Sequence, residues 1–458
     1  MLTRLDDAKS DVLDRAAEVG EHSRATGRPL GAGERESAPE RRAFLERYYR
    51  HVPAEDLVGR DPVDVFGVAT SHRQLSALRQ EGTSNVRVFT PTLEEHGWSS
   101  GHTVVEVVTD DMPFLVDSVV AELTREDRSI HLIVHPQMVA RRDLNGDLAE
   151  LPDVEASAAP PGTVVESWIH VEIDRETDAP VLEGLQASLR RVLGDVRVAV
   201  EDWTKMQDTA ERLSRELGGA STGVPADSVT EARELLAWLA DGHFTFLGYR
   251  EYLLEVQDGA DVLRAVAGTG LGLLRWDQHQ STSFSRLDAE VREKARDKSL
   301  LIITKANSRS TVHRPAYLDY VGIKTFDEAG EVTGERRFLG LFTSAAYTQS
   351  VQRIPVLRRK SAAVLERTGF APMSHSGKDL LEIIETYPRD ELSRPRSRTS
   401  SRSRPRSCTC RNAVSSGSSC GATTTAVSCP ASSTSRGTDT PRRSACGWNR
   451  SCARPSTR

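Results

Sequence analysis

Cysteine is absent from the first 392 residues of this 458-residue chain. All six cysteines lie in residues 393–458, at Cys408, Cys410, Cys420, Cys429, Cys446 and Cys452. A long cysteine-free segment excludes a disulfide-held secreted scaffold and any cysteine-ligated zinc site within it. The six positions contain no C-x-x-C pair, so a zinc knuckle at the end of the chain is disfavoured as well.

Long apolar runs are also missing. The amino-terminus is acidic early and lacks the apolar stretch of about 7–15 residues that a signal peptide needs. No run approaches the roughly 18 apolar residues of a membrane helix. We therefore expect a cytoplasmic protein with no membrane partner.

Large apolar side chains are nearly absent from residues 393–458, where only Val414, Val427 and Trp448 occur. This segment has 13 arginines, no lysine and one acidic residue, so it is basic, whereas residues 1–392 are acidic. It cannot bury enough surface to offset its ordering entropy, and we expect it to be disordered. One interpretation is a basic arm that contacts nucleic-acid phosphates. Its Arg/Ser/Thr/Cys composition favours a second interpretation, in which the reading frame shifts just after Leu392. We therefore expect no nucleic-acid partner.

Composition and periodicity divide the rest of the chain into segments. A polar, Gly- and Pro-containing stretch reads as a flexible leader, and apolar residues at helical spacing follow it. Alternating and continuous apolar runs then predict strands. The expected segments are a leader (1–39), a helical segment (40–83), an α+β domain (84–217), a β-rich domain (218–353), a helical connector (354–392) and the disordered tail (393–458).

The α+β domain has the most informative pattern. Strands are predicted near Val86 and over residues 103–110, and a helix with one apolar stripe follows over residues 115–123. Further strands are predicted over residues 130–134 and 163–174, before a second helix over residues 180–193. This βαββα order indicates a sandwich of the ferredoxin-like type. Residues 196–200 could form a last strand or continue the helix.

The β-rich domain begins with a helix over residues 229–239 and a long strand from His243. Residues 300–346 are dominated by strand signals, with a turn at residues 327–330, so a mainly antiparallel sheet is expected. Two helices are predicted after it. The glycines at 268, 270 and 272 lack the G-x-G-x-x-G spacing of a dinucleotide loop, so a turn or bulge is favoured there.

Acidic residues gather where the strand 103–110 runs into the following helix. Asp110, Asp111 and Asp117 could act as an acid and a base, but helix N-termini favour negative side chains for structural reasons alone. We favour capping, with Met112 and Pro113 leading into the first turn.

A second candidate set is cationic and polar. Its members are Lys305, Ser308, Arg309, His313 and Arg314, which could clamp a carboxylate or a phosphate. A solvated hairpin with local ion pairs is the favoured alternative. His131, His135 and His170 fall on neighbouring strands, and we expect them to be satisfied sheet histidines and not metal ligands.

Several blocks of the chain resemble the amino-terminal region of the very large bacterial NAD-specific glutamate dehydrogenases. They are DDMPFLVDSVV (110–120), IHLIVHPQMVARRD (130–143), ESWIHVEID (166–174), LLAWLADGHFTFLGYREY (235–252), LIITKANSRSTVHRPAYLDYVGIK (301–324), RRFLGLFTSAAYTQSVQRIPVLRRK (336–360) and HSGKDLLEIIETYPRDEL (375–392). The resemblance implies an ACT-like α+β domain, then a β-rich PAS-like domain and helices. It places the catalytic core far C-terminal to this region, so no catalytic, NAD-binding or metal-binding residue is expected in this chain, although the intact family enzyme uses NAD.

The resemblance implies a truncated regulatory and assembly fragment whose partner is the missing catalytic region of the same enzyme, in a homo-oligomer when intact. ACT-type domains commonly bind amino acids at a loop-to-helix junction, which here points to residues 109–117. Backbone N–H groups at the helix start could hold the carboxylate of an amino-acid effector, and the acidic pair would favour its ammonium group. The alternative is a free-standing amino-acid-sensing ACT/PAS-like regulatory protein.

Overall fold

The structure is a computed structural model, and it describes residues 2–26, 37–217, 224–257, 260–275, 296–389 and 392. The chain divides into two units, residues 1–395 and 396–458. The tail that we expect to be disordered lies outside the described residues. Within the described part, no helix is long and apolar enough to cross a membrane.

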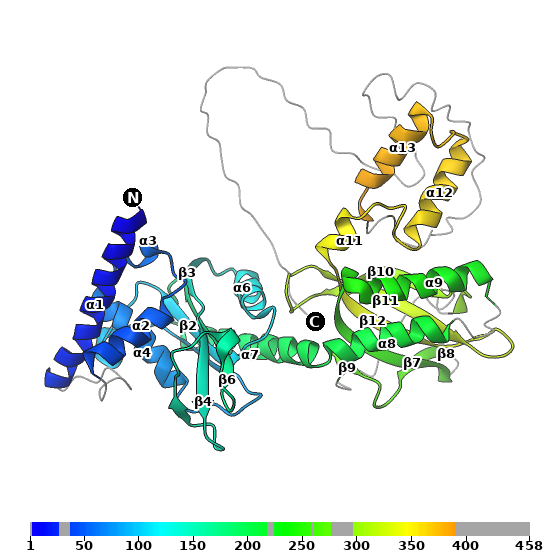
Figure 1. The fold of residues 1–458 in the computed structure, drawn as a ribbon. Coiled ribbons are helices and arrows are strands. Elements are labelled where there is room, and N and C mark those ends of the chain that lie inside the picture. The colour runs from blue at the N-terminus through cyan, green and yellow to red at the C-terminus, as the bar shows by residue number, and fades with distance from the viewer. Residues whose placement is uncertain are drawn as a thin grey trace, which may run out of the picture. The chain divides into compact units, whose positions relative to one another are not determined.

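In the described residues, four helices precede the first strand, and Figure 1 shows them in blue. They are α1 (Leu2–Thr26), α2 (Ala38–Tyr48), α3 (Ala54–Leu57) and α4 (Pro62–Leu75). The expectation of a flexible leader is wrong for residues 2–26, because α1 buries Val12, Leu13, Ala16 and Ala17 against α2 and α4. Its buried stripe is narrow and half alanine, so the polar composition around it masked the helical period.

The first sheet contains β1 (Asn85–Phe89), β2 (Thr103–Asp110), β3 (Ile130–Val134), β4 (Gln137–Arg142), β5 (Leu148–Glu150) and β6 (Val164–Ile173). Its order is β1-β2-β6-β4-β5, with β3 also paired to β6, and every pairing is antiparallel. The strands β3 and β4 pair with opposite halves of β6, so together they fill one place in the sheet. With helices α6 (Leu115–Arg125) and α7 (Ala179–Glu201), the order βαββα is confirmed.

Residues 196–200 are helical and extend α7. The sheet position beside β2 is taken instead by β1, which comes from before the βαββα unit. Helices α6 and α7 pack on one face of the sheet, and the amino-terminal helices pack on the other. Both faces are therefore covered, and this explains why β2 is buried along nearly its whole length.

The second sheet has the order β10-β11-β12-β7-β8, with the short β9 paired to β7. The strands are β7 (Phe244–Gln257), β8 (Ala260–Ala265), β9 (Leu271–Gly272), β10 (Leu301–Arg309), β11 (Tyr317–Phe326) and β12 (Val332–Phe342). All pairs are antiparallel, which confirms the expectation. Helices α8 (Trp203–Glu216) and α9 (Ala226–Trp238) share its apolar core. Helices α11 (Ser344–Thr348), α12 (Leu357–Thr368) and α13 (His375–Thr386) follow.

A partly buried ion pair joins the amino-terminal helices to the first sheet. Arg60, between α3 and α4, donates two hydrogen bonds to Glu172 of β6, at 2.6 and 3.0 Å. Burial alone would raise the pKa of Glu172, but the His170 ring at 3.8 Å and the Arg60 guanidinium lower it to about 2. The ionised carboxylate therefore stabilises the folded state.

The stability contributed by Glu172 depends on pH. Because its pKa is about 2 when folded and 4.5 ordinarily, the contribution is complete above the ordinary value and is lost as pH falls toward the folded value. We expect the free energy of unfolding of Glu172→Gln to fall less steeply than that of the wild type as pH drops from 6 to 3. Urea denaturation at a series of pH values measures both slopes, and parallel curves would contradict the assignment.

Two glycines make a matched test of packing in helices. A Cβ on Gly67 of α4 would overlap the Trp98 side chain, whereas a Cβ on Gly184 of α7 meets nothing within 4 Å. We expect Gly67→Ala to destabilise the fold by about 1–3 kcal/mol through overpacking. Gly184→Ala should stabilise it by up to about 1 kcal/mol through helix propensity. The urea midpoints of unfolding of the two variants measure both changes in stability. Two changes of the same sign would contradict the helix contacts described above.

Candidate functional site

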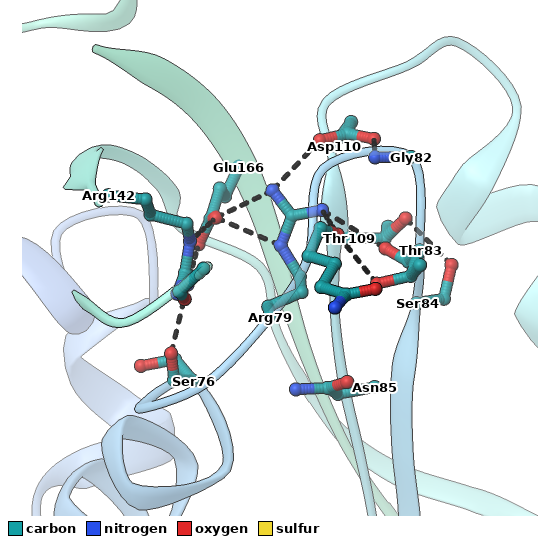
Figure 2. A network of polar contacts seen from close by, with 12 residues as sticks. Ser76, Arg79, Gly82, Thr83, Ser84, Asn85, Thr109, Asp110, Arg142 and Glu166 are labelled. Carbon is teal, nitrogen blue, oxygen red and sulfur yellow. Dashed lines mark hydrogen bonds and ion pairs between the residues drawn. The ribbon is translucent and has the colours of Figure 1, made fainter. Parts of the chain in front are cut away.

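A buried network of charged residues lies where β2 and β6 meet the chain segment after α4 (Figure 2). Arg79 is its centre, with a side chain that is fully buried. Its Nε and one terminal nitrogen donate to the same oxygen of Glu166, at 2.9 and 2.7 Å. That nitrogen also lies 2.8 Å from Asp110, and the other terminal nitrogen donates to the carbonyl of Thr83 at 3.0 Å.

Glu166 of β6 is also fully buried, and three side chains donate to it. Besides Arg79, they are Arg142 of β4, at 2.6 and 3.0 Å, and the Trp168 indole, at 3.0 Å. Burial raises the pKa of Glu166, but the Arg142 hydrogen bond, the charge of Arg79 and the Trp168 hydrogen bond together lower it. Glu166 is therefore a fixed anion, unsuited to exchange a proton at neutral pH.

Asp110 and Asp111 do not cap α6. Asp110 binds Arg197 of α7 at 2.7 Å as well as Arg79. Partial burial would raise its pKa, but the Arg197 hydrogen bond and the charge of Arg79 lower it. Asp111 accepts hydrogen bonds from Ser167 at 2.5 Å and Gln137 at 2.7 Å. The capping interpretation is wrong here because long-range donors, which local sequence does not reveal, occupy both carboxylates.

Helix α6 begins at Leu115, two residues after Pro113. The residue at its N-cap position is Phe114, which has a left-handed backbone (φ 73°) and makes no side-chain cap. Met112 is half-buried against the core under α6 and α7, and Pro113 is exposed. The first backbone N–H groups of α6 consequently have no side-chain acceptor at the N-cap.

The two candidate sets of the sequence meet at one point. His313, in the loop between β10 and β11, contacts Asp117 of α6 through its Nδ1 at 2.9 Å. The backbone N–H of His313 donates to the Ser118 hydroxyl at 2.9 Å. The Phe114 ring lies against His313, with centroids 5.0 Å apart, and stacks on Trp203 of α8 at 5.6 Å.

The other four members of the cationic set have separate environments. Lys305 pairs with Asp319 at 2.7 Å, and Arg309 lies over the Tyr317 ring. Arg314 donates to the carbonyl of Phe342 at 2.6 Å, whereas Ser308 is exposed. These side chains do not converge on one point, so an anion contact by the whole set stays a prediction without geometric support.

The sheet histidines also have separate environments. His131 contacts Asp174 at 2.8 Å, and His135 contacts the Ser167 hydroxyl at 2.9 Å. Burial lowers the pKa of His135. His170 is buried beside Glu172. In the described residues, no group of three or more His, Cys, Asp or Glu side chains could hold a metal ion.

Sequence reasoning missed the residues that fix the site: Arg79, Arg142, Glu166, Arg197 and Trp203. Glu166 carried a local signal, because it is a charged residue in a strand that is buried along most of its length. Chemically, the junction offers uncapped backbone donors at α6 beside carboxylates already held by arginines.

Removing Arg79 tests whether the network holds the junction. Arg79→Met leaves Glu166 with Arg142, so we expect a loss of about 3 kcal/mol, the lower end of the range for removing one partner of a buried ion pair. The matched control is Arg212→Met, which breaks the exposed pair with Glu216 and should cost about 0.5 kcal/mol or less. Urea denaturation measures both, and equal losses would contradict a central role for Arg79.

Two segments of the chain match models of known protein families. Residues 44–189 match the family model "Glutamate dehydrogenase, ACT1 domain", and residues 354–394 match "Glutamate dehydrogenase, helical motif 1". The first match begins within α2 and includes α3, α4 and the first sheet. The second coincides with the expected helical connector.

Three similar proteins are NAD-specific glutamate dehydrogenases. That of Halomonas elongata is 39% identical over 363 residues, which are 78% of this chain and 22% of that protein. That of Pseudomonas aeruginosa is 40% identical over 360 residues, 77% of this chain and 22% of that protein. That of Mycobacterium tuberculosis is 30% identical over 324 residues, 70% of this chain and 18% of that protein. The chain therefore spans about a fifth of the length of the curated relatives it matches.

Proposed function

Because the chain belongs to the amino-terminal region of the NAD-specific glutamate dehydrogenase family, we propose that it is the regulatory and assembly region of such an enzyme. The whole enzyme would convert L-glutamate, NAD+ and water into 2-oxoglutarate, ammonia and NADH. Catalysis and NAD binding would belong to the region of the relatives that this chain does not match. Its partner would be that region, within a cytoplasmic homo-oligomer.

The proposed ligand of the region is an amino-acid effector at the junction between β2 and α6. The effector's carboxylate would accept hydrogen bonds from the uncapped N–H groups of α6, where the helix dipole also favours an anion. Its ammonium group would lie near Asp111 or Asp117. Asp117 is exposed and Asp111 half-buried, so both can reach a ligand.

The observation that carries a regulatory function is the pair of strained residues at this junction. Phe114 (φ 73°) and His313 (φ 68°) are both left-handed without being glycine, and their rings are in contact. Each such residue costs about 1–3 kcal/mol, and strain of this kind gathers at ligand sites and switches. An effector that altered Phe114 would act directly on the loop between β10 and β11, and on Trp203 of α8.

The second sheet is proposed to be a PAS-like module. Its support is a six-stranded antiparallel sheet with α8 and α9 sharing its core. A free-standing amino-acid sensor would use the same junction. The matches to dehydrogenases over most of this chain favour the first proposal over that alternative.

Calorimetry of the 458-residue chain with the proteinogenic L-amino acids tests the effector site. We expect at least one to bind, and Asp117→Asn to weaken it about tenfold, the effect of losing one charge-assisted hydrogen bond. The control is Asp208→Asn, an exposed acid on α8 that should leave the affinity unchanged. Absence of heat with every amino acid, or equal loss in both variants, would contradict the site.

A further inference from the structure

A cleft lies well away in sequence from the junction. It has a volume of about 330 Å³ and is bounded by the start of α9, the segment that leads into β10, and the first turn of α12. Small-molecule sites typically occupy about 300–1,000 Å³ and combine apolar walls with a few polar groups. The cleft is within this range, although at its lower end, and so suits a compact ligand.

Its walls are apolar and one of them is strained. Leu300, Leu301 and Ile303 line it from the β10 side, and Val356 lines it from α12. Val356 has φ 71°, which is a genuine outlier for a β-branched residue. Its backbone N–H donates to the Glu231 carboxylate of α9 at 2.5 Å. The strained position is therefore held by a specific contact that fixes the first turn of α12 beside α9.

The charges around the cleft are mainly positive. Lys298, Arg359 and Lys360 line it, and Glu231 is its one acidic lining residue. The carboxylate of Glu231 already receives two hydrogen bonds from Arg358, at 3.0 and 2.8 Å. Lys298 pairs with Glu331, but both side chains are more than half exposed, so that pair is weak and exchangeable.

We propose that this cleft binds a small amphipathic carboxylate, with its hydrocarbon part on Leu300, Leu301 and Ile303 and its anionic group beside Arg359 and Lys298. An apolar body would remove the lining side chains from water. An anion would complement the positively charged side chains at the rim. This site is separate from the junction at α6, so the two proposals stand or fall independently.

Calorimetry of the full chain with octanoate tests the proposal, with 1-octanol and octylammonium as probes of equal chain length. We expect octanoate to bind at least tenfold more tightly than either. Ser228→Trp, which places a large ring in the cleft, should abolish binding. The double variant Lys298→Glu with Arg359→Glu should weaken octanoate at least tenfold.

Arg353→Glu is the matched control, because Arg353 is exposed on the segment before α12 and does not line the cleft. It should bind octanoate as the wild type does. Lack of octanoate binding, equal affinity for the three probes, or equal affinity in the charge-reversed double variant and the control would each overturn the proposal. The double variant changes two exposed surface residues and is therefore expected to fold. It tests the proposal even if Ser228→Trp does not fold.

Discussion

The carboxylate of Glu166 is withdrawn from water, and an unpaired buried charge costs several kcal/mol. Hydrogen-bond donors inside the protein must therefore compensate the charge. They come from three parts of the chain: Arg79 after α4, Arg142 of β4, and Trp168 of β6 itself. Arg79 then reaches Asp110, which also binds Arg197 of α7. One buried anion thus holds the end of the first sheet and the start of the loop toward α6.

The loop held in this way carries the contacts to the second sheet. Phe114 stands between Trp203 and His313, and Val312, beside His313, is fully buried in the core under α6 and α7. Thr311 donates to Asp195 of α7 at 2.8 Å, and burial raises the pKa of that carboxyl. The loop between β10 and β11 is consequently attached to both α6 and α7. A change at α6 has a direct path of packed side chains to the second sheet.

The sequence predicted the features that depend on local periodicity. The apolar run 103–110 and the helical stripe 115–123 led to the βαββα order. The strand signals of residues 300–346 and the turn at residues 327–330 led to an antiparallel second sheet. The features it missed depend on distant partners. The place of β1 beside β2, the packing of α1, and the pairing of Arg79 with Glu166 each join segments whose relation only the folded chain defines. Asp117 and His313 belong to different predicted sets, and no local pattern indicated that their side chains are in contact.

Hydrogen exchange on the Glu166→Gln variant tests the central claim that this carboxylate holds the junction and, through it, the loop between β10 and β11. The account predicts faster exchange of the Asp111 amide, which bonds to Val165, and of the His313 amide, which bonds to Ser118. Amides of β7 and β12 should keep their protection. If the Asp111 amide exchanges faster while the His313 amide stays protected, the junction and the second sheet are not coupled. If neither changes, Glu166 does not hold the junction.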